Sequence, residues 1–391
     1  MISFELSSEQ RSRQMWAREF AMHYITPIAS RADREHEFPW DVVQEGVRAG
    51  LTTILIPTAY GGKGYDNVSG GLIFEELGRA CAGIATIFGA SILGSGPIVL
   101  LGSEEQKGRL LRRITEDDSG RFLCGFAVTE AGSGSAAVSG DPQFGVQLRA
   151  ERHADVYVLS GSKRFISNGS VARLFSVLAR TLRAKVAFGG LSFFAVEADA
   201  GLKIERVEDK MGQCACPTAE IRLERIEVSA ANLLGKEGLG ALGFTQTISF
   251  STPLVASVCV GVAHAALEVA LQYARAASLL DDQGVAMRLF DMASKVEAAR
   301  NLVWSALWHN DQRQDRSTGR LRGAPNLKLA AMAKVFASDA CTQVVDDALK
   351  VVGPSALAEG HMLSKLVRDA KLMQIFEGTN EIHRIASARL L

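Results

Sequence analysis

The hydrophobic pattern changes twice along this chain, and that change limits the possible folds more than any other feature. Apolar residues recur at helical spacing from about residue 7 to residue 116, and again in long segments after Gly238. Between these regions, from about Gly120, short segments rich in β-branched and aromatic residues alternate with Gly, Asp and Asn. The order helices, strands, helices predicts a mostly α, α+β protein with domains at residues 1–118, 119–236 and 237–391.

The expected elements can be placed along the middle and last regions. The middle region predicts a small antiparallel sheet or barrel, with strands at residues 121–128, 156–166, 174–179, 191–196 and 219–228. The last region predicts a helical bundle, with helices at residues 241–277, 285–308, 326–352 and 361–376. The polar stretch at residues 311–323 is typical of a solvated connection.

Charge and cysteine content argue against several classes of function. The 43 basic and 43 acidic residues cancel, so no net charge attracts nucleic acid or an anionic membrane. The six cysteines include no CxxC pair, and no His or Cys cluster completes a zinc site beside Cys214 and Cys216. The N-terminus lacks a basic-then-apolar signal segment. We therefore expect a cytoplasmic protein that uses no metal, no nucleic acid and no membrane.

Several motifs resemble one known family. The segment IFEGTNEIHR at residues 375–384, preceded by RDAK at 368–371, resembles the C-terminal signature of the acyl-CoA dehydrogenases. Two middle segments are similar to its flavin-contacting parts, namely FAVTE at 126–130, followed by Gly134 and Ser135, and GSKRFISNG at 161–169. Further matches follow in family order at residues 210–212, 216–218 and 234–238. The resemblance covers essentially the whole chain and implies the family fold of helical domain, β-domain and four-helix bundle.

The resemblance implies an FAD-dependent enzyme that converts an acyl thioester into the enoyl thioester. Glu377 stands at the position of the base that takes the α-proton, while the flavin N5 accepts the β-hydrogen as hydride. A thioester α-proton is only weakly acidic, and shielding the carboxylate from water raises its pKa toward that of the substrate. For an isolated Glu-Gly pair, an acid at a helix end would be the simpler interpretation. The ten-residue signature favours the base.

The remaining candidate residues follow from matched positions. The resemblance implies that the cofactor contacts Phe126, Val128, Thr129, Gly134, Ser135, Phe165, Ser167, Gln283, Lys350, Gly353, Thr379 and Glu381. It implies that the acyl donor contacts Ser135, Ser249, Thr252 and Gly378. The alternatives stay open, because hydroxyls often cap turns and strand ends, and a Phe in a strand is commonly part of the core.

The chain departs from the family pattern at two places. The segment R-x-x-F-G, whose Arg reaches the FAD pyrophosphate of a neighbouring subunit, is absent from residues 273–283, and Lys350 is the candidate replacement cation. An Asp and an Arg that often hold CoA correspond here to Ser249 and Thr252. The donor is therefore left open between free CoA and an acyl carrier protein.

Three functions are compatible with these residues. The leading one is dehydrogenation, with an electron-transfer flavoprotein that reoxidises the cofactor. The second is an oxygenase of specialised metabolism, in which O₂ reacts with the reduced flavin and the acyl substrate is unusual. The third is a helical scaffold that has lost FAD. The resemblance also implies a homotetramer, a dimer of dimers with FAD across a subunit boundary.

Overall fold

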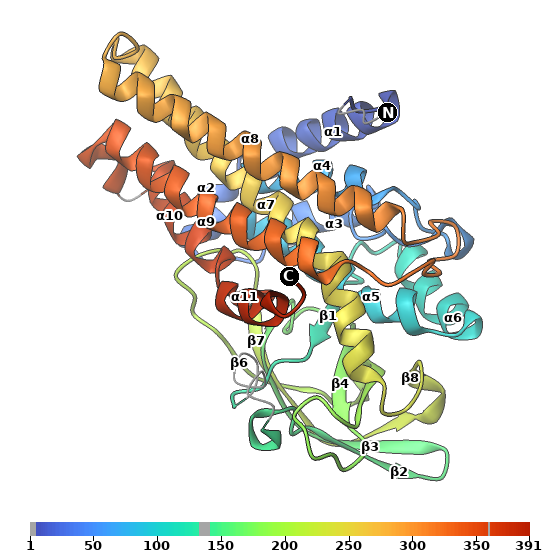
Figure 1. Ribbon diagram of the computed structural model, residues 1–391. Helices are drawn as coiled ribbons and strands as arrows, with labels where there is room; N and C mark the ends of the chain where they lie inside the picture. The colour runs from blue at the N-terminus through green and yellow to red at the C-terminus, as the bar shows by residue number, and fades with distance from the viewer. Residues whose placement is uncertain (1–4, 133–140, 359) are drawn as a thin grey trace.

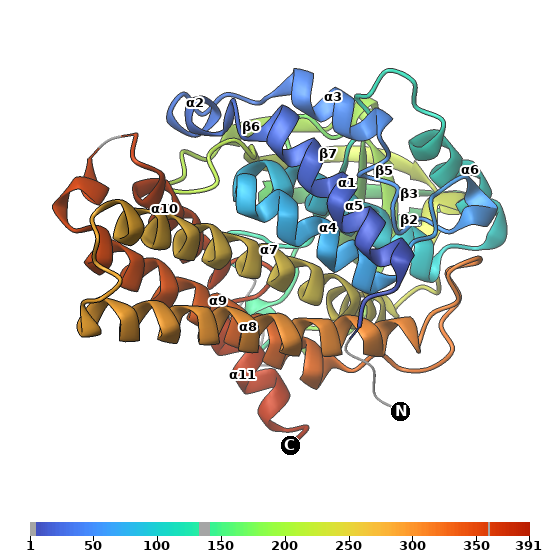
Figure 2. The same cartoon turned by 90° about the horizontal axis from the view of Figure 1, so that it is seen from above.

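The protein consists of two helical regions packed around one side of a central sheet. The computed structural model describes residues 5–132, 141–358 and 360–391, so the expected flavin contacts Gly134 and Ser135 lie outside the described residues. Figure 1 shows most of the helices grouped above the sheet. Figure 2, seen from above, shows the N-terminal helices lying beside the C-terminal bundle. The expected α+β, mostly α architecture is confirmed.

The N-terminal region is helical, as predicted. Its helices are α1 (Ser8–Phe20), α2 (Ala29–Arg34), α3 (Trp40–Arg48), α4 (Asn67–Ala80), α5 (Ala82–Leu101) and α6 (Glu104–Thr115). Ser7 and Ser103 begin α1 and α6 with capping boxes, in which each Ser and the Gln three residues later bond each other's backbone N–H. Local sequence therefore fixes where these two helices start.

The middle region forms a sheet in the order β6-β7-β3-β2-β4-β5-β8, with β1 paired to β4. Its strands are β1 (Cys124–Ala127), β2 (Arg149–His153), β3 (Val156–Ser167), β4 (Leu174–Arg180), β5 (Leu191–Glu197), β6 (Lys203–Val207), β7 (Thr218–Ser229) and β8 (Leu233–Leu234). The β1–β4 pair is parallel, whereas the sequence predicted antiparallel pairing throughout. Strands β2, β6 and β8 were not predicted, because the first two are charged and largely exposed and the third has two residues.

The C-terminal region is a helical bundle. It contains α7 (Gly240–Ala276), α8 (Gln283–Asp311), α9 (Leu327–Val352), α10 (Met362–Met373) and α11 (Asn380–Ala388). The sequence predicted one helix to residue 376, but α10 ends at Met373 and α11 follows as a separate helix. The break lies in the segment that carries the proposed base.

Among residues 5–132, 141–358 and 360–391, two helices are long and apolar enough to cross a membrane by composition alone, namely α5 and α7. In each, 67% of the most apolar window is buried inside the protein. Helix α7 also approaches α4 closely, since a Cβ at Gly261 would lie 2.1 Å from the carbonyl oxygen of Glu75. Both helices are therefore explained as core helices of the fold.

Helix α7 contains a proline where it reaches the candidate site. Pro253 has no N–H to bond the carbonyl of Ser249, four residues earlier. The side-chain amide of Asn310, on α8, donates to that carbonyl at 3.3 Å. The neighbouring helix thus satisfies the acceptor that the proline leaves free, and α7 continues past the site.

Candidate active site

Glu377 lies in the short loop that joins α10 to α11. Its φ is 57° and that of Gly378 is 89°, so two successive residues have left-handed backbone. This conformation is easy for Gly but uncommon for other residues, and it persists only where the surroundings hold it. The left-handed pair ends the helical path after α10 and turns the Glu377 side chain toward α7.

Two side chains of the loop's surroundings touch Glu377 directly. The Ser251 hydroxyl, on α7, donates a short hydrogen bond to Glu377 Oε1. His383 Nε2, on α11, lies 3.0 Å from the carbonyl oxygen of Glu377, and since a carbonyl only accepts, this nitrogen carries the proton. Burial lowers the pKa of His383 to about 4, so the ring is neutral near pH 7.

The electrostatic setting of the Glu377 carboxyl group favours a base. Burial raises its pKa above the ordinary value, while the Ser251 hydrogen bond and the charge of Lys334 act in the opposite direction. The residue as a whole is half-buried. A carboxylate in such a position can accept a proton from a weak carbon acid near neutral pH.

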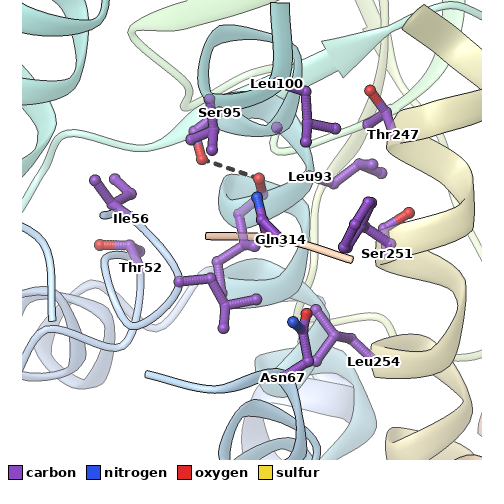
Figure 3. Close-up of a pocket in the computed structure, with 15 residues that line it drawn as sticks. Thr52, Ile56, Asn67, Leu93, Ser95, Leu100, Thr247, Ser251, Leu254 and Gln314 are labelled. Carbon is purple, nitrogen blue, oxygen red and sulfur yellow. Dashed lines mark hydrogen bonds between the residues drawn. The ribbon is translucent and has the colours of Figure 1, made fainter. Parts of the chain in front are cut away.

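A pocket lies between α5, α7 and the segment before α4 (Figure 3). Its cavity volume is about 60 Å³, which is small for a ligand site, and the wider hollow of about 530 Å³ includes space that opens to solvent. Ser251 lines the pocket and also donates a hydrogen bond to Glu377, so the Glu377 carboxyl group lies next to a residue of the pocket wall. In Figure 3, Ser251 and Leu254 face Ile56 and Thr52 across this space.

The pocket wall is apolar with a few neutral polar groups. Its polar side chains are Thr52, Asn67, Ser95, Thr247, Ser251 and Gln314, and none of the lining residues that the structure describes is charged. Gln314 comes from the connection between α8 and α9, which the sequence predicted only as a solvated segment. This connection therefore also supplies a wall of the pocket.

The two expected flavin segments of the β-domain lie together. The backbone N–H of Arg164 donates to the carbonyl of Thr129 at 2.8 Å, and Lys163 Nζ donates to the carbonyl of Val128 at 2.9 Å. Ser167 closes β3 and pairs with Thr218 of β7. The structure thus joins residues that are more than 30 positions apart into one surface.

Phe165 has the features of an aromatic residue that contacts a planar ligand. Its φ is 59° and 52% of the residue is exposed, both unusual for a Phe within a strand. The Arg164 guanidinium lies 4.6 Å from its ring centroid. Phe126, in contrast, is half-buried and its ring stacks between those of Phe193 and Phe244. An exposed ring in held backbone fits the isoalloxazine of a flavin.

The candidates for the other half of the cofactor lie on the bundle. Gln283 is the first residue of α8, and Gly353, with φ of 79°, ends α9. Thr379 is the N-cap of α11 and its side chain accepts from the N–H of Ile382, while Glu381 is exposed in the first turn. Their cofactor roles stay predictions.

Lys350 already has anionic partners. Its Nζ lies 2.6 Å from Asp346 Oδ2 and 3.3 Å from Asp347 Oδ1, and these hydrogen bonds raise its pKa. A cation that replaces the missing Arg would have to exchange these carboxylates for phosphate. The replacement stays a prediction.

The two α7 candidates for donor binding are buried. Ser249 and Thr252 have no exposed surface, and the Ser249 hydroxyl donates to the carbonyl of Thr245 at 2.8 Å. The Thr252 hydroxyl is also buried, without a hydrogen-bond partner among the described residues. A direct contact to the donor from either residue stays a prediction, and the described structure offers no exposed oxygen for it.

Three residues of the site were not identified from the sequence. Ser251 is 126 positions from Glu377, and only the nearby Pro253 hinted that this part of α7 is special. His383 lies inside the C-terminal signature, which could have drawn attention to it. Lys334 lies in an ordinary amphipathic helix pattern, so no signal distinguished it from a surface lysine.

Comparison with known proteins identifies the family. Models of the acyl-CoA dehydrogenase N-terminal, middle and C-terminal domains match residues 7–118, 125–226 and 238–391. The chain is 36% identical to the probable acyl-CoA dehydrogenase YngJ of Bacillus subtilis (strain 168), over 100% of both sequences.

Solved structures agree. Butyryl-CoA dehydrogenase from Megasphaera elsdenii matches with a TM-score of 0.90 and 30% identity, over 100% of this chain and 99% of that one. An acyl-CoA dehydrogenase complexed with FAD from Bacillus anthracis matches with a TM-score of 0.89 and 29% identity, over 100% of this chain and 67% of that one. The chain belongs to the acyl-CoA dehydrogenase family of FAD-dependent oxidoreductases.

Proposed function

We propose that this enzyme oxidises the Cα–Cβ bond of an acyl thioester and that Glu377 removes the α-proton. The observation that carries the proposal is the position of Glu377, which is held in left-handed backbone and hydrogen-bonded to Ser251, a residue that lines an apolar pocket. Its carboxyl group has a pKa raised by burial and a hydroxyl partner in Ser251. These features suit a base that acts on a substrate bound in the pocket.

The proposed roles divide between the two sides of the site. FAD, when bound, supplies the acceptor for the hydride that leaves the β-carbon. Phe165, Thr129 and Ser167 would hold it from the β-domain. The Glu377 carboxylate takes the α-proton, and the electrons of that C–H bond form the new Cα=Cβ bond. The backbone N–H of Glu377 would hold the thioester oxygen, where negative charge develops.

The pocket lining indicates the kind of acyl group. Because its walls are apolar and its described lining residues carry no charge, a second carboxylate on the acyl chain would be buried there without a cation. We therefore expect an uncharged acyl group. The donor part remains a proposal, either CoA or an acyl carrier protein, since Ser249 and Thr252 replace the charges that often hold CoA.

The electron acceptor and the location in the cell follow from the family. We expect an electron-transfer flavoprotein as acceptor and a cytoplasmic enzyme. The oxygenase alternative is not favoured, because the relatives named above are dehydrogenases. The scaffold alternative fails for a similar reason, because the family consists of enzymes and the described β-domain residues fit a flavin.

We also expect a homotetramer. Helices α8 and α9 expose large apolar side chains, with 73% of Phe290, 69% of Met287, 43% of Phe336 and 41% of Met332 accessible. Exposed apolar residues in such number are typical of surfaces that a second copy covers. Light scattering of the purified protein tests this, and a monomeric mass would contradict it.

The proposed reaction is tested by anaerobic bleaching of the flavin. The FAD-loaded protein is mixed with a panel of neutral acyl-CoA and acyl-carrier thioesters, and the flavin absorbance is followed. We expect bleaching with at least one donor, with the enoyl product identified by mass. Glu377→Gln should stop bleaching while FAD stays bound. Glu151→Gln makes the same change at an exposed position of β2 and should bleach at the normal rate.

The variants separate the possible failures. If Glu377→Gln bleaches as fast as the unmodified enzyme, Glu377 is not the base. If no donor bleaches the unmodified protein, the thioester proposal is wrong. Rapid O₂ uptake coupled to turnover, with an oxygenated product, would restore the oxygenase alternative.

A further inference from the structure

A buried lysine lies under the loop that carries Glu377. Lys334, on α9, has no exposed surface, and its Nζ donates to the carbonyl oxygen of Gly378 at 2.8 Å. The same Nζ donates to Oδ1 of Asn380 at 2.9 Å. Lys334 therefore binds the residue directly after Glu377 and the first residue of α11.

The contact falls where the backbone most needs support. Left-handed backbone at Glu377 is strained, and the carbonyl groups of this turn cannot form the hydrogen bonds of a continuous helix. Three hydrogen bonds replace the helical ones. His383 bonds the carbonyl of Glu377, Lys334 bonds that of Gly378, and the N–H of Asn380 bonds that of Gln374 at 3.0 Å. Hydrogen bonds from α9 and from α11 thus hold the turn in place.

The second partner of Lys334 is itself held firmly. Asn380 is 2% exposed, and its Nδ2 donates to Ser338 Oγ and to Asp339 Oδ1, both at 2.8 Å. Ser338 and Asp339 follow Lys334 by about one helical turn on α9. Lys334 and this polar cluster therefore fix the start of α11 against one face of α9.

The charge of Lys334 is not cancelled by a hydrogen-bonded carboxylate among the described residues. Its two acceptors are neutral, and the carboxylates that act on it from a greater distance are Glu377, Asp339 and Glu381. The Cys259 thiol on α7 is neutral near pH 7, because burial raises its pKa to about 12. Burial lowers the pKa of Lys334 to about 8, so the ammonium form still dominates at pH 7. Keeping an unpaired ammonium group buried is costly, which makes a functional reason the best explanation.

We propose, on the basis of the function proposed above, that Lys334 is a positioning residue for Glu377. Its hydrogen bond to Gly378 fixes the left-handed turn, and its positive charge keeps the Glu377 carboxyl group deprotonated between turnovers. The turn also sets the direction of the Glu377 N–H, so one side chain aligns both the base and a donor for the thioester oxygen.

The groups around Glu377 set the expected direction of the effect. Burial raises the pKa of Glu377, and the Ser251 hydrogen bond and the Lys334 charge lower it. His383, from α11, is neutral, and its ring hydrogen-bonds the carbonyl of Glu377 rather than its carboxyl group. Removing the ammonium group therefore leaves burial less opposed. The base then becomes protonated at higher pH, and the rate falls earlier on acidification.

The test uses two variants of the FAD-loaded protein. Lys334→Met removes both charge and donor, and Lys334→Gln keeps a donor without charge. Anaerobic flavin bleaching is measured as a function of pH, together with bound FAD and the melting temperature. We expect Lys334→Met to bleach about tenfold more slowly or worse, because a displaced base is costly, with FAD still bound. The acidic limb of its profile should move to higher pH.

The remaining outcomes are each decisive. Lys334→Gln should recover part of the maximal bleaching rate, because it keeps a hydrogen-bond donor. The acidic limb of its pH profile should still lie at higher pH than in the unmodified enzyme, because the charge is missing. Lys328→Met, on the same helix, should behave as the unmodified enzyme. A normal rate and normal pH profile in either Lys334 variant would overturn the proposal. If Lys334→Met does not fold, Lys334→Gln alone decides through its pH profile.

Failure of this inference differs from failure of the proposed function. If Lys334 variants are normal but Glu377→Gln is inactive, Glu377 is the base and its position does not depend on Lys334. If Glu377→Gln is itself active, the proposed function is wrong, whatever the Lys334 variants do.

Discussion

Two lysines of this protein are equally buried, yet the β-domain and the bundle use them differently. Lys163, on β3, and Lys334, on α9, have no exposed surface, and burial lowers the pKa of each to about 8. Each also donates to a backbone carbonyl of a proposed site segment, Val128 in one case and Gly378 in the other. The difference lies in their remaining partner.

Lys163 forms a closed ion pair. Its Nζ lies 2.8 Å from Glu130 Oε1, and Glu130 also accepts from the backbone N–H groups of Gln147 and Leu148. The ammonium charge is thus cancelled inside the β-domain, where its effect is to hold strands together. Lys334 has neutral acceptors among the described residues, so its field reaches Glu377. Burial alone does not tell a structural lysine from one that tunes a base.

The largest expected effect on stability is at Lys163. Lys163→Met leaves the Glu130 carboxylate buried without its cation, which should lower the free energy of unfolding by about 3–5 kcal/mol. Adding Glu130→Gln removes the stranded charge and should recover much of this loss. Denaturant unfolding of both variants checks the prediction. If Lys163→Met is as stable as the double variant, the Glu130 carboxylate does not depend on Lys163 for its charge compensation.

The next effect is specific to the bundle and depends on pH. The pKa of His383 is about 4 in the folded protein, below its ordinary value of 6.5, so the unfolded chain binds the proton more tightly. Stability from this group is complete above pH 6.5 and declines toward pH 4, by about 3 kcal/mol in total. His383→Gln should flatten this decline. An unchanged profile in that variant would assign the acid sensitivity to other groups.

Lys334→Met should cost less stability than Lys163→Met. It leaves a neutral carbonyl at Gly378 unsatisfied, rather than a charged group, so about 1–3 kcal/mol of the free energy of unfolding is at stake. The same unfolding measurement decides the order of the two. If Lys334→Met were the more destabilising, Lys334 would be mainly a structural residue and the comparison would fail.

The smallest effect on stability is expected at Ser251. Ser251→Ala removes one hydroxyl that is largely buried, at a cost of about 1 kcal/mol. Because that hydroxyl lowers the pKa of Glu377, its loss should move the acidic limb of the bleaching profile to higher pH. This one variant would then change the pH dependence of bleaching clearly while changing the free energy of unfolding only slightly. A limb that stays in place would mean that the Ser251 contact is absent when substrate is bound.

Prediction from sequence succeeded where the pattern is local. Strands β3, β4, β5 and β7 and helices α7 and α9 lie within three residues of their expected bounds, because buried strands and long helices repeat their apolar positions regularly. Strands β2 and β6 were not predicted, because their side chains are mainly exposed and charged. Helix α11 was not predicted, because it is only nine residues long and follows the two left-handed residues that end the helical path.

The site shows the same division. Glu377 and Phe165 stand in motifs whose neighbours in sequence identify them, although their roles still await the experiments above. Ser251 and Lys334 reach the same loop from 126 and 44 positions away, and a single sequence carries no record of such contacts. Polar residues at ordinary helix positions become functional candidates only when their partners are seen.

The amino-acid sequence by itself determined the order of helical and strand regions, the family motifs and the identity of the proposed base. Those features depend on neighbouring residues and on short repeats. Tertiary structure alone decided which buried ammonium group is paired with a carboxylate and which one faces Glu377. The reason is physical, because the energy of a buried charge depends on the few atoms packed around it, and folding brings those atoms from distant parts of the chain.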